Sequence, residues 1–276
     1  MLKKLIFLSL SLFILASCGG NKSTAEGEEG MAQFAEDEEF KDAHESPEEN
    51  DHTAAGEMIT FSAADGTDAS AYALMTASAS DKYLLVIHEW WGLNDHIKEE
   101  ADRLFGELGD VNVLALDMYD GKVATSPDEA GKFMQAVKPE RAEAIVKGAI
   151  AKAGADAKIG TIGWCFGGGW SLKSSIMAGD QGAGCVIYYG MPVQEAAELA
   201  PLKADVLGIF AEQDGWITPE VVNKFSDLAK ATGKQVETRQ FDAAHAFANP
   251  SNPKYDETAA KEANAMALNF LTERLQ

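Results

Sequence analysis

Short apolar runs alternate with longer amphipathic stretches along the chain from residue 58 onward. The continuous runs, bounded by turn residues, predict buried strands, and apolar positions that recur every three or four residues predict helices. We expect strands at residues 58–61, 72–76, 83–87, 111–116, 159–163, 185–189, 206–211 and 236–241. We expect helices between Asn94 and Gly109 and at residues 128–137, 139–153, 166–178, 193–200, 219–230 and 255–275. Because parallel strands need crossover helices, this alternation predicts an α/β fold with a mostly parallel central sheet and helices on both faces.

The beginning of the chain has a different pattern. Lys3 and Lys4 precede an apolar run at residues 5–15, which is too short for a membrane-spanning helix of about 20 residues. The sequence Leu15-Ala-Ser-Cys18 then resembles a bacterial lipobox. The resemblance implies that residues 1–17 are a lipoprotein signal peptide and that Cys18 is acylated. The protein would then be anchored in the bacterial cell envelope, with the membrane as a partner only through this lipid. The alternative is an ordinary signal peptide with an incidental cysteine.

The stretch after the lipobox is strongly acidic. Residues 19–57 carry thirteen acidic residues and two lysines, and Phe34 and Phe40 are their aromatic residues. Such a composition buries too little apolar surface to offset the entropy that ordering would cost. We therefore expect residues 18–56 to comprise the lipidated cysteine and a disordered acidic tether, and residues 57–276 to form one folded domain.

Charge and composition exclude several classes of partner. The formal net charge is −21, and the part after the tether is still net acidic, which argues against nucleic acid and anionic lipid headgroups. Neither a dinucleotide-binding nor a phosphate-binding glycine motif is present, so no cofactor is expected. No cluster of metal ligands is expected either, because His44 and His52 fall in the tether. His88 and His96 have no ligand set at the usual spacing beyond Glu89.

A glycine-rich turn containing a cysteine follows the strand expected at residues 159–163. In Gly163-Trp-Cys165-Phe-Gly167 the cysteine stands between an apolar strand and a helix, which is the arrangement of a nucleophile elbow. A helix N-terminus lowers the pKa of a thiol and supplies N–H donors for an oxyanion. A buried structural cysteine is the alternative. Cys185 could pair with Cys165 in an oxidising envelope, although two cysteines make no disulfide framework.

Two further polar residues follow predicted strands. Asp214 comes just after residues 206–211, and His245 comes just after residues 236–241. A lone histidine is more often structural, and an Asp-Gly pair is more often a turn. The chain order of nucleophile, acid and histidine is nevertheless that of an α/β-hydrolase, in which such groups gather at the carboxyl ends of the strands. The combination predicts a catalytic triad of Cys165, His245 and Asp214.

Residues 57–275 resemble the dienelactone hydrolases, a cysteine-using branch of the α/β-hydrolases. The resemblance rests on Val86-Ile-His-Glu89-Trp-Trp-Gly-Leu-Asn94, Asp117-Met-Tyr119, Gly163-Trp-Cys-Phe-Gly-Gly168, the segment around Asp214, and His245-Ala-Phe-Ala248. It implies an α/β-hydrolase fold and the triad named above. It also implies that Glu89 helps to generate the thiolate and that the backbone N–H groups of Trp90 and Phe166 form the oxyanion hole. Judged by position alone, Glu89 could equally be an ion-pair residue.

The chain departs from this family at two positions. The dienelactone-cleaving members bind the substrate carboxylate with two arginines, and Asn249 and the segment Asp120-Gly-Lys122 stand at their places here. Without a fixed guanidinium a carboxylate is held poorly, so a dienelactone is not the expected substrate. Residues flanking the site segments suggest an aromatic pocket instead, for which the candidates are Trp91, Tyr119, Lys122, Trp216 and Phe247.

The sequence therefore predicts a hydrolase that cleaves a small-molecule ester or lactone through a thioester at Cys165. The alternative is a lipid-anchored binding protein that keeps the hydrolase fold without turnover, since one fold hosts many functions. A redox pair of Cys165 and Cys185 is a third interpretation, which nothing in their spacing favours.

Overall fold

The computed structural model describes residues 30–48, 50 and 52–276. Within them, eight strands form one sheet in the order β1-β2-β4-β3-β5-β6-β7-β8. β1 and β2 are antiparallel to their neighbours, and the other six strands are parallel. The strands are β1 (Glu57–Ser62), β2 (Asp68–Leu74), β3 (Lys82–Ile87), β4 (Asn112–Leu116), β5 (Lys158–Trp164), β6 (Gly182–Tyr188), β7 (Asp205–Ala211) and β8 (Val236–Phe241).

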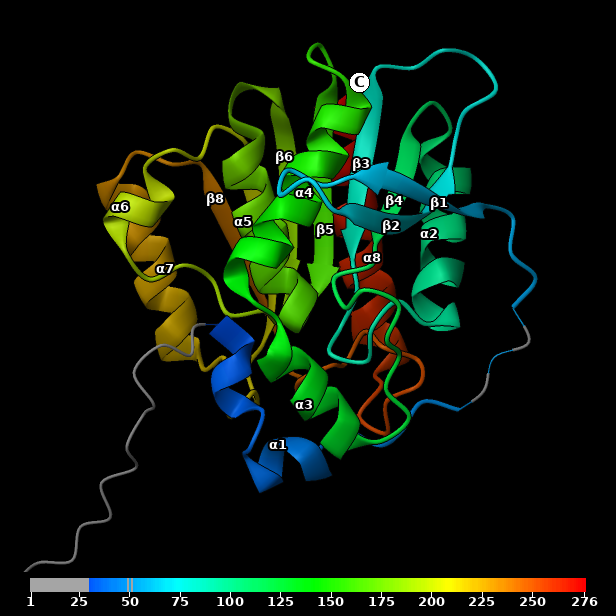
Figure 1. Cartoon of the computed structure of the whole chain (residues 1–276). Helices are drawn as coiled ribbons and strands as arrows, with labels where there is room; N and C mark the ends of the chain where they lie inside the picture. Colours follow the sequence, from blue (N-terminus) through cyan, green and yellow to red (C-terminus); the bar gives the residue numbers. More distant parts are fainter. Residues whose placement is uncertain (1–29, 49, 51) are drawn as a thin grey trace, which may run out of the picture.

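Helices cover both faces of this sheet, as predicted (Figure 1). α2 and α8 contact each other on one face, and α4 and α5 contact each other on the opposite face. The helices are η1 (Gly30–Phe34), α1 (Glu38–Asp42), α2 (Asp95–Leu108), α3 (Pro127–Ala136), α4 (Pro139–Ala153), α5 (Phe166–Ala178), η2 (Gly179–Gln181), α6 (Ala196–Leu199), α7 (Pro219–Ala231) and α8 (Glu257–Leu275). None of the described helices is long and apolar enough to cross a membrane.

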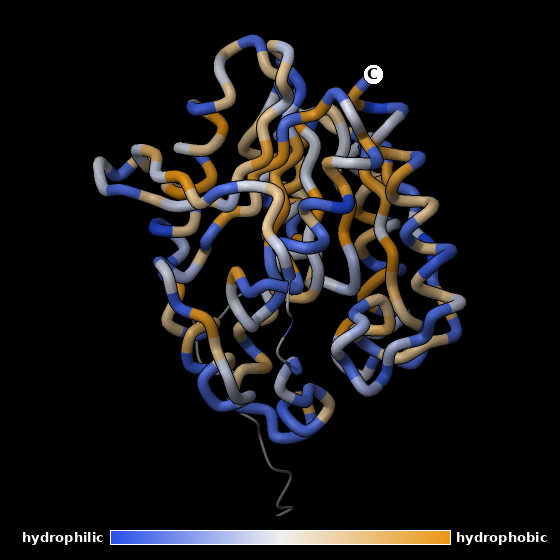
Figure 2. The backbone as a smooth tube through the Cα atoms, turned by 90° about the vertical axis from the view of Figure 1, so that its right-hand side faces the viewer, coloured by the Kyte–Doolittle hydropathy of each residue, from blue (hydrophilic) through white to orange (hydrophobic). Residues whose placement is uncertain are grey.

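Local sequence explains most of these boundaries. Asn94 caps α2 by accepting a hydrogen bond from the Ile97 N–H, and the helix ends at Gly109, whose φ is +71°. Prolines stand in the first turn of α3, α4 and α7, where a missing N–H costs nothing. The central parallel strands are continuous apolar runs buried on both faces, and Figure 2 shows them as the hydrophobic interior of the molecule.

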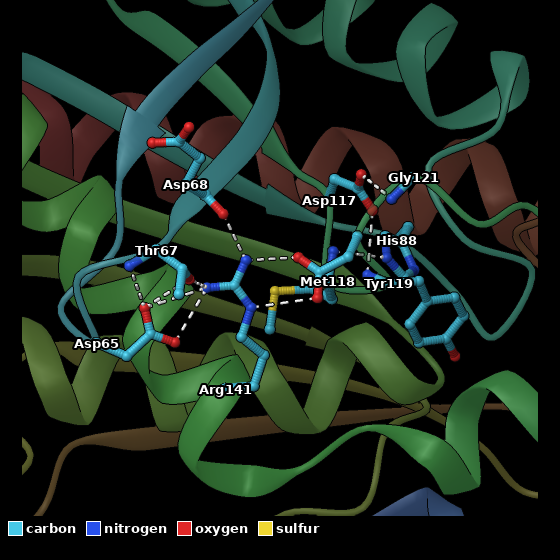
Figure 3. A network of polar contacts seen from close by, with 10 residues as sticks. Asp65, Thr67, Asp68, His88, Asp117, Met118, Tyr119, Gly121 and Arg141 are labelled. Atoms are coloured by element: carbon cyan, nitrogen blue, oxygen red, sulfur yellow. Dashed lines mark hydrogen bonds and ion pairs between the residues drawn. The ribbon is translucent and has the colours of Figure 1, made fainter.

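The β1–β2 hairpin is tied to the strand ends by Arg141 of α4. Its guanidinium binds the Asp65 carboxylate in the hairpin turn, the Asp68 carbonyl oxygen at the start of β2 and the Asp120 carboxylate after β4 (Figure 3). Asp65 also accepts hydrogen bonds from the N–H and hydroxyl of Thr67, which closes the turn. One guanidinium therefore connects the antiparallel edge of the sheet to the loop after β4.

The structure departs from the predicted disordered tether over residues 18–56 within residues 30–44, which form η1 and α1. η1 and α1 lie against α3 and α5, at the end of the molecule where the parallel strands finish (Figure 1). Residues 30–44 are called the N-terminal cover here, and its inward-facing side chains, each at most 3% exposed, are those of Met31, Ala35, Phe40 and His44. The signal peptide, Cys18 and the rest of the predicted tether up to residue 29 lie outside the described residues.

The spacing of a few residues explains why the composition was misleading. Asp37 caps α1 by accepting a hydrogen bond from the Phe40 N–H, and this places the aromatic ring on the inner side. α3 comes so close at Gly131 that a Cβ there would lie 2.7 Å from the Ala35 carbonyl oxygen. The acidic residues lie on the outer side, where Lys41 pairs with Glu38. An average over the stretch conceals this one-sided pattern.

Candidate active site

Cys165 lies at a sharp turn between β5 and α5 and is 1% exposed. Its φ of +53° falls in the left-handed region, which residues other than glycine rarely adopt. Glycines on both sides make the turn sterically feasible. A Cβ at Gly163 would lie 2.1 Å from the Gly167 carbonyl oxygen, and a Cβ at Gly167 would lie 2.2 Å from the Ile87 carbonyl oxygen. The predicted strand–turn–helix geometry is therefore present, and the catalytic role of Cys165 stays a prediction.

Asp214 and His245 meet beside this turn. Asp214 follows β7, His245 follows β8, and the His245 Nδ1 lies 2.6 Å from the Asp214 Oδ2. The other carboxylate oxygen accepts the N–H groups of Trp216 and Ile217, each at 2.9 Å. Because an ionised carboxylate only accepts, His245 donates from Nδ1 and its Nε2 is the nitrogen left for the site. The Nε2 is buried and has no hydrogen-bond partner among the described residues.

Burial and charge act in opposite directions on these groups. Burial raises the pKa of the Cys165 thiol above its ordinary value, and His245 and the Phe166 N–H do not overcome it. The first turn of α5 does act to lower this pKa, through the Phe166 N–H, but the desolvation of the thiolate by burial outweighs it. Burial opposes the charged form of His245, but the Asp214 carboxylate raises the pKa of the imidazole overall. The same pairing lowers the pKa of Asp214 despite its burial.

Glu89 lies just after β3 with its carboxylate buried in the site. One oxygen accepts a hydrogen bond from the Asn249 side-chain amide at 2.6 Å, and the other accepts one from the Tyr189 hydroxyl at 3.4 Å. Burial raises the pKa of Glu89 to about 7, although the charge of His245 and the two hydrogen bonds act against this. The resemblance places a proton acceptor for the thiol here, and a carboxyl with this pKa can exchange a proton near neutral pH.

His88 holds the backbone of Glu89 in place. Its Nδ1 lies 2.5 Å from the Glu89 carbonyl oxygen, and its Nε2 accepts the Met118 N–H at 3.2 Å (Figure 3). Burial lowers the pKa of His88 to about 4, so the ring is neutral, with Nδ1 as the donor. Asp117 fixes the same loop after β4 by accepting the N–H of Tyr119. Sequence analysis did not single out His88, because a buried histidine between a strand and a glutamate has no distinctive pattern.

The two predicted oxyanion donors lie at the expected places in the chain. Phe166 is the first residue of α5, and its N–H, like every first-turn N–H, has no intrahelical partner. This N–H acts on the Cys165 thiol directly and favours its charged form. Trp90 lies directly after Glu89 in the loop that follows β3 and is fully buried. Whether both N–H groups bind an oxyanion stays a prediction.

The predicted pocket residues are divided between different surroundings. Trp91 lines a cavity of about 460 Å³, and Trp216 packs its ring 5.8 Å from that of His245. Phe247 is fully buried against Phe241 and does not line this cavity, so its place in a substrate pocket stays a prediction. Tyr119 packs on the rings of His88 and Phe166. The Lys122 ammonium lies 5.5 Å from the centre of the Phe133 ring.

The cavity lies next to Glu89 and is lined by parts of α2, α8 and the segment after His245. Neither Cys165 nor His245 lines it. Its charged lining residues are Glu89, Glu99, Glu100 and Arg103, and the guanidinium of Arg103 is already paired with Glu100 and Glu107. The lining is therefore net acidic, and position 249, which is Asn rather than Arg, adds no positive charge to it.

The space over the triad is filled by the N-terminal cover. The ring of Phe40 lies 5.0 Å from those of Trp90 and Trp216 and 5.8 Å from that of His245. The His44 ring lies 5.3 Å from His245, and burial lowers the pKa of His44 to about 3, which keeps it neutral. Sequence analysis missed both residues. The signal that could have found them is an aromatic residue and a histidine spaced by one helical turn within an acidic stretch.

The expectation that no metal ligands cluster is also wrong. His44, Cys165 and His245 each present a ligand atom, and these atoms all lie within 4.8 Å of one another. His44 had been assigned to the tether, so the sequence could not place it beside the other two. Cys165 and Cys185 are both free, and the Cys185 sulfur lies 3.5 Å from the Ser171 hydroxyl in the core.

Comparison with known proteins points to one family. The model of the dienelactone hydrolase family matches residues 69–275. Protein usf from Aquifex pyrophilus is 30% identical over 235 residues, which cover 80% of this chain and 99% of that protein. The family match spans every segment that carries Glu89, Cys165, Asp214 and His245, because it runs from β2 to α8.

Solved structures agree with this fold. A dienelactone hydrolase-like promiscuous phosphotriesterase from metagenomic libraries superposes with a TM-score of 0.69 at 24% identity, covering 81% of this chain and all of that one. Dienelactone hydrolase from Anabaena variabilis superposes with a TM-score of 0.59 at 14% identity, covering 82% of this chain and all of that one. At such identities the likeness shows a shared α/β-hydrolase architecture.

Proposed function

The chain belongs to the dienelactone hydrolase family, and we propose that it hydrolyses a carboxylic ester or lactone by acyl transfer to Cys165. The observation that carries this proposal is the 2.6 Å hydrogen bond between His245 and Asp214 beside a thiol on a left-handed elbow. An elbow of this kind is strained, and strain is retained where it serves to present a side chain. A protein that only binds has no need for it.

The proposed reaction begins with removal of the thiol proton. Glu89, whose pKa is about 7, takes this proton when substrate enters, and the imidazolium of His245 stabilises the thiolate. The sulfur attacks the carbonyl carbon, a C–S bond forms, and the oxyanion is held by the N–H groups of Phe166 and Trp90. The C–O bond of the ester then breaks, and His245 gives its proton to the leaving oxygen.

Water completes the cycle. Neutral His245 takes a proton from a water molecule, whose oxygen attacks the thioester carbon. The C–S bond breaks, the carboxylic acid leaves, and Cys165 departs as thiolate beside a protonated His245. Throughout both halves Asp214 holds the ring in one orientation and stabilises its positive charge, as the 2.6 Å contact requires.

The substrate we propose is neutral and apolar near the reacting ester. Glu89 is bound by the Asn249 amide rather than by a guanidinium, and the adjoining cavity is net acidic. A substrate carboxylate would meet repulsion and no bidentate partner there. We expect kcat/KM for a p-nitrophenyl ester with an alkyl acyl chain to exceed that of its carboxylate-bearing counterpart by about tenfold or more. Equal values for the two esters would remove this part of the proposal.

Intact-protein mass spectrometry separates an enzyme from a non-catalytic binding protein. The full chain is mixed with p-nitrophenyl acetate and quenched in acid, and an acetyl adduct that maps to Cys165 and turns over with time is expected. Release of p-nitrophenol without any Cys165 adduct would refute the thioester route. Complete absence of turnover, with ester binding retained, would favour the binding protein.

We also propose that lipid on Cys18 holds the protein in the bacterial cell envelope, on the basis of the lipobox-like sequence. In this proposal the anchor sets the location of the protein and takes no part in the reaction. In a bacterial host, the parent chain should fractionate with membranes, and Cys18→Ser should move to the soluble fraction with its esterase activity intact. Identical fractionation of the two chains would refute the anchor.

A further inference from the structure

Three buried ligand atoms converge where the N-terminal cover meets the triad. They belong to His44, Cys165 and His245, and they lie within 4.8 Å of one another. In both histidines the Nδ1 is already engaged: that of His44 lies 2.6 Å from the Phe40 carbonyl oxygen, and that of His245 lies 2.6 Å from Asp214. The Nε2 atoms of both rings are buried and have no partner among the described residues. In each ring, Nε2 is thus the nitrogen that remains available to bind a ligand.

This pattern is that of a metal ligand. A histidine that binds a metal through Nε2 almost always donates its Nδ1–H to a carbonyl oxygen or a carboxylate, which fixes the ring and makes the ligand more basic. His44 has the carbonyl partner, and His245 has the carboxylate partner. Two imidazoles and a thiolate form a set suited to Zn²⁺ and similar thiophilic cations, whereas Mg²⁺ and Ca²⁺ prefer oxygen ligands.

We propose that His44, Cys165 and His245 bind a thiophilic divalent transition-metal ion, with Zn²⁺ and Co²⁺ as probes, and that the bound ion blocks the nucleophile reversibly. Binding forms one metal–sulfur and two metal–nitrogen bonds, and the thiol proton and any proton on the His245 Nε2 pass to solvent. A fourth position is left for water. The metal site rests on geometry alone, whereas its inhibitory effect rests on the proposed function.

The fit requires a small closure of the site. Ligand atoms around tetrahedral zinc lie roughly 3.3–3.6 Å apart, given Zn–N bonds of about 2.0–2.1 Å and Zn–S bonds of about 2.3 Å. From the 4.8 Å limit, the three atoms here would have to approach one another by up to roughly 1.2–1.5 Å. Cys165 and His245 are held by the sheet, but His44 belongs to the cover, which is attached by side-chain packing. His44 is therefore the ligand that can move to complete the site.

Cobalt absorbance tests the site without substrate. The full chain carrying Cys18→Ala, so that this cysteine supplies no thiol, is titrated with Co²⁺ under anaerobic conditions. We expect one equivalent to bind with a near-ultraviolet thiolate-to-cobalt charge-transfer band and visible bands of tetrahedral cobalt. Zn²⁺ should displace the cobalt and abolish the bands. Cys165→Ser should lose the charge-transfer band, and the matched control Cys185→Ala should keep it.

The role of His44 is tested in the same titration. Loss of a residue that merely supports a ligand weakens metal affinity about 10–100-fold, so His44→Ala should weaken it by at least about tenfold. The control His96→Ala removes a half-buried histidine that lines the neighbouring cavity and lies outside the cluster, and it should leave the affinity unchanged. Circular dichroism of each variant establishes that it is folded. Absence of the charge-transfer band in the folded parent, or equal Co²⁺ affinity in His44→Ala, would overturn the proposal.

Inhibition is measured separately. Zn²⁺ should abolish p-nitrophenyl ester hydrolysis by the parent, a chelator should restore it, and His44→Ala should need at least about tenfold more Zn²⁺ relative to its own metal-free rate. A chain that binds Co²⁺ through sulfur but hydrolyses no ester would refute the proposed function and leave the metal site standing. A chain that hydrolyses the ester but shows no cobalt charge-transfer band would refute the metal site and leave the proposed function standing.

Discussion

The two sides of the active site are built in different ways. The floor consists of Cys165, Asp214 and His245 at the ends of β5, β7 and β8, and its shape is set by parallel strands and by glycines at which no Cβ fits. The opposite side is the N-terminal cover, which contributes no strand to the sheet and is attached through Met31, Ala35, Phe40 and His44.

This difference has an energetic consequence. Backbone hydrogen bonds of six parallel strands hold the floor, so its groups cannot separate without global unfolding. The cover is attached by a small apolar contact and by ion pairs with solvent-exposed carboxylates, such as that of Lys41 with Asp128, which contribute little. A segment of this kind opens locally at a cost well below that of global unfolding. We therefore interpret the floor as the fixed part of the site and the cover as its movable part, through which substrate gains access.

The largest expected effect is on the floor. Cys165→Ala should lower kcat for p-nitrophenyl acetate by at least about a thousandfold, because no other group on this side can form the acyl intermediate. The matched control Cys185→Ala removes the second buried thiol, which lies in the core, and should retain activity within about threefold. Initial rates on both purified variants give the comparison. An active Cys165→Ala enzyme would show that the elbow is not the reacting part.

Glu89 gives the next effect, and it depends on pH. Only the ionised carboxylate can accept the thiol proton, so a pKa of about 7 predicts activity that rises as pH increases through 7 and falls below it. Glu89→Gln should lower kcat/KM about a hundredfold near neutral pH and remove this dependence. Glu99→Gln changes another carboxylate lining the same cavity and should preserve the profile. An unchanged pH profile in Glu89→Gln would exclude Glu89 as the proton acceptor.

The third prediction concerns the rigidity of the floor. Gly167→Ala places a Cβ 2.2 Å from the Ile87 carbonyl oxygen and 2.5 Å from that of His88. Because these are backbone atoms that cannot move aside as a flexible side chain would, the free energy of unfolding should fall by about 3 kcal/mol. Gly106→Ala in α2 meets no neighbouring atom and should raise it by roughly 0.5–1 kcal/mol. Urea denaturation of each variant measures the difference. Similar values for the two variants would contradict the steric account of the elbow.

The fourth prediction compares two equally buried phenylalanines, one in the cover and one in the core. Phe40 in the cover and Phe225 in α7 are both fully buried. Truncation of Phe225 to Ala should cost about 3–5 kcal/mol, as for a core position. Phe40→Ala should cost only about 1 kcal/mol, since its loss is limited to the free energy of attaching the cover.

The rate at which Cys165 is alkylated provides a second test of whether the cover opens independently of the core. Iodoacetamide should alkylate Cys165 several-fold faster in Phe40→Ala than in the parent, because opening of the cover exposes the thiol. Phe225→Ala serves as the control for general loosening, measured well below its unfolding midpoint. Equal costs in stability for both variants, together with equal alkylation rates, would show that the cover is part of the core.

Much of the floor could be predicted from local sequence. The strand, the glycines and the cysteine of the elbow are contiguous, so the turn at Cys165 followed from a five-residue segment. Asn94 and the three helix-starting prolines act within one turn of their own position, and the predicted α2, α3, α4 and α7 match within about two residues. Such features depend on neighbours along the chain, which the sequence displays directly.

Features that depend on distant neighbours could not be predicted in this way. The packing of Phe247 against Phe241, away from the cavity beside Glu89, depends on the turn after β8 and on a strand residue six positions earlier. The pKa of Cys165 is raised rather than lowered, because burial is a property of the whole assembled site. Tyr189, which binds Glu89 through its hydroxyl, was overlooked because the two lie one hundred residues apart.

The sequence by itself determined the alternation of strands and helices, the elbow at Cys165 and the order of Asp214 and His245, since each is a local pattern or a position after a strand. Only the tertiary structure decided the position of residues 30–44. Their acidic composition favours solvent, and it is the complementary surface formed by α3, Trp90 and Trp216 that brings Phe40 and His44 inward. A binding surface assembled from three separate parts of the chain does not exist until the chain has folded.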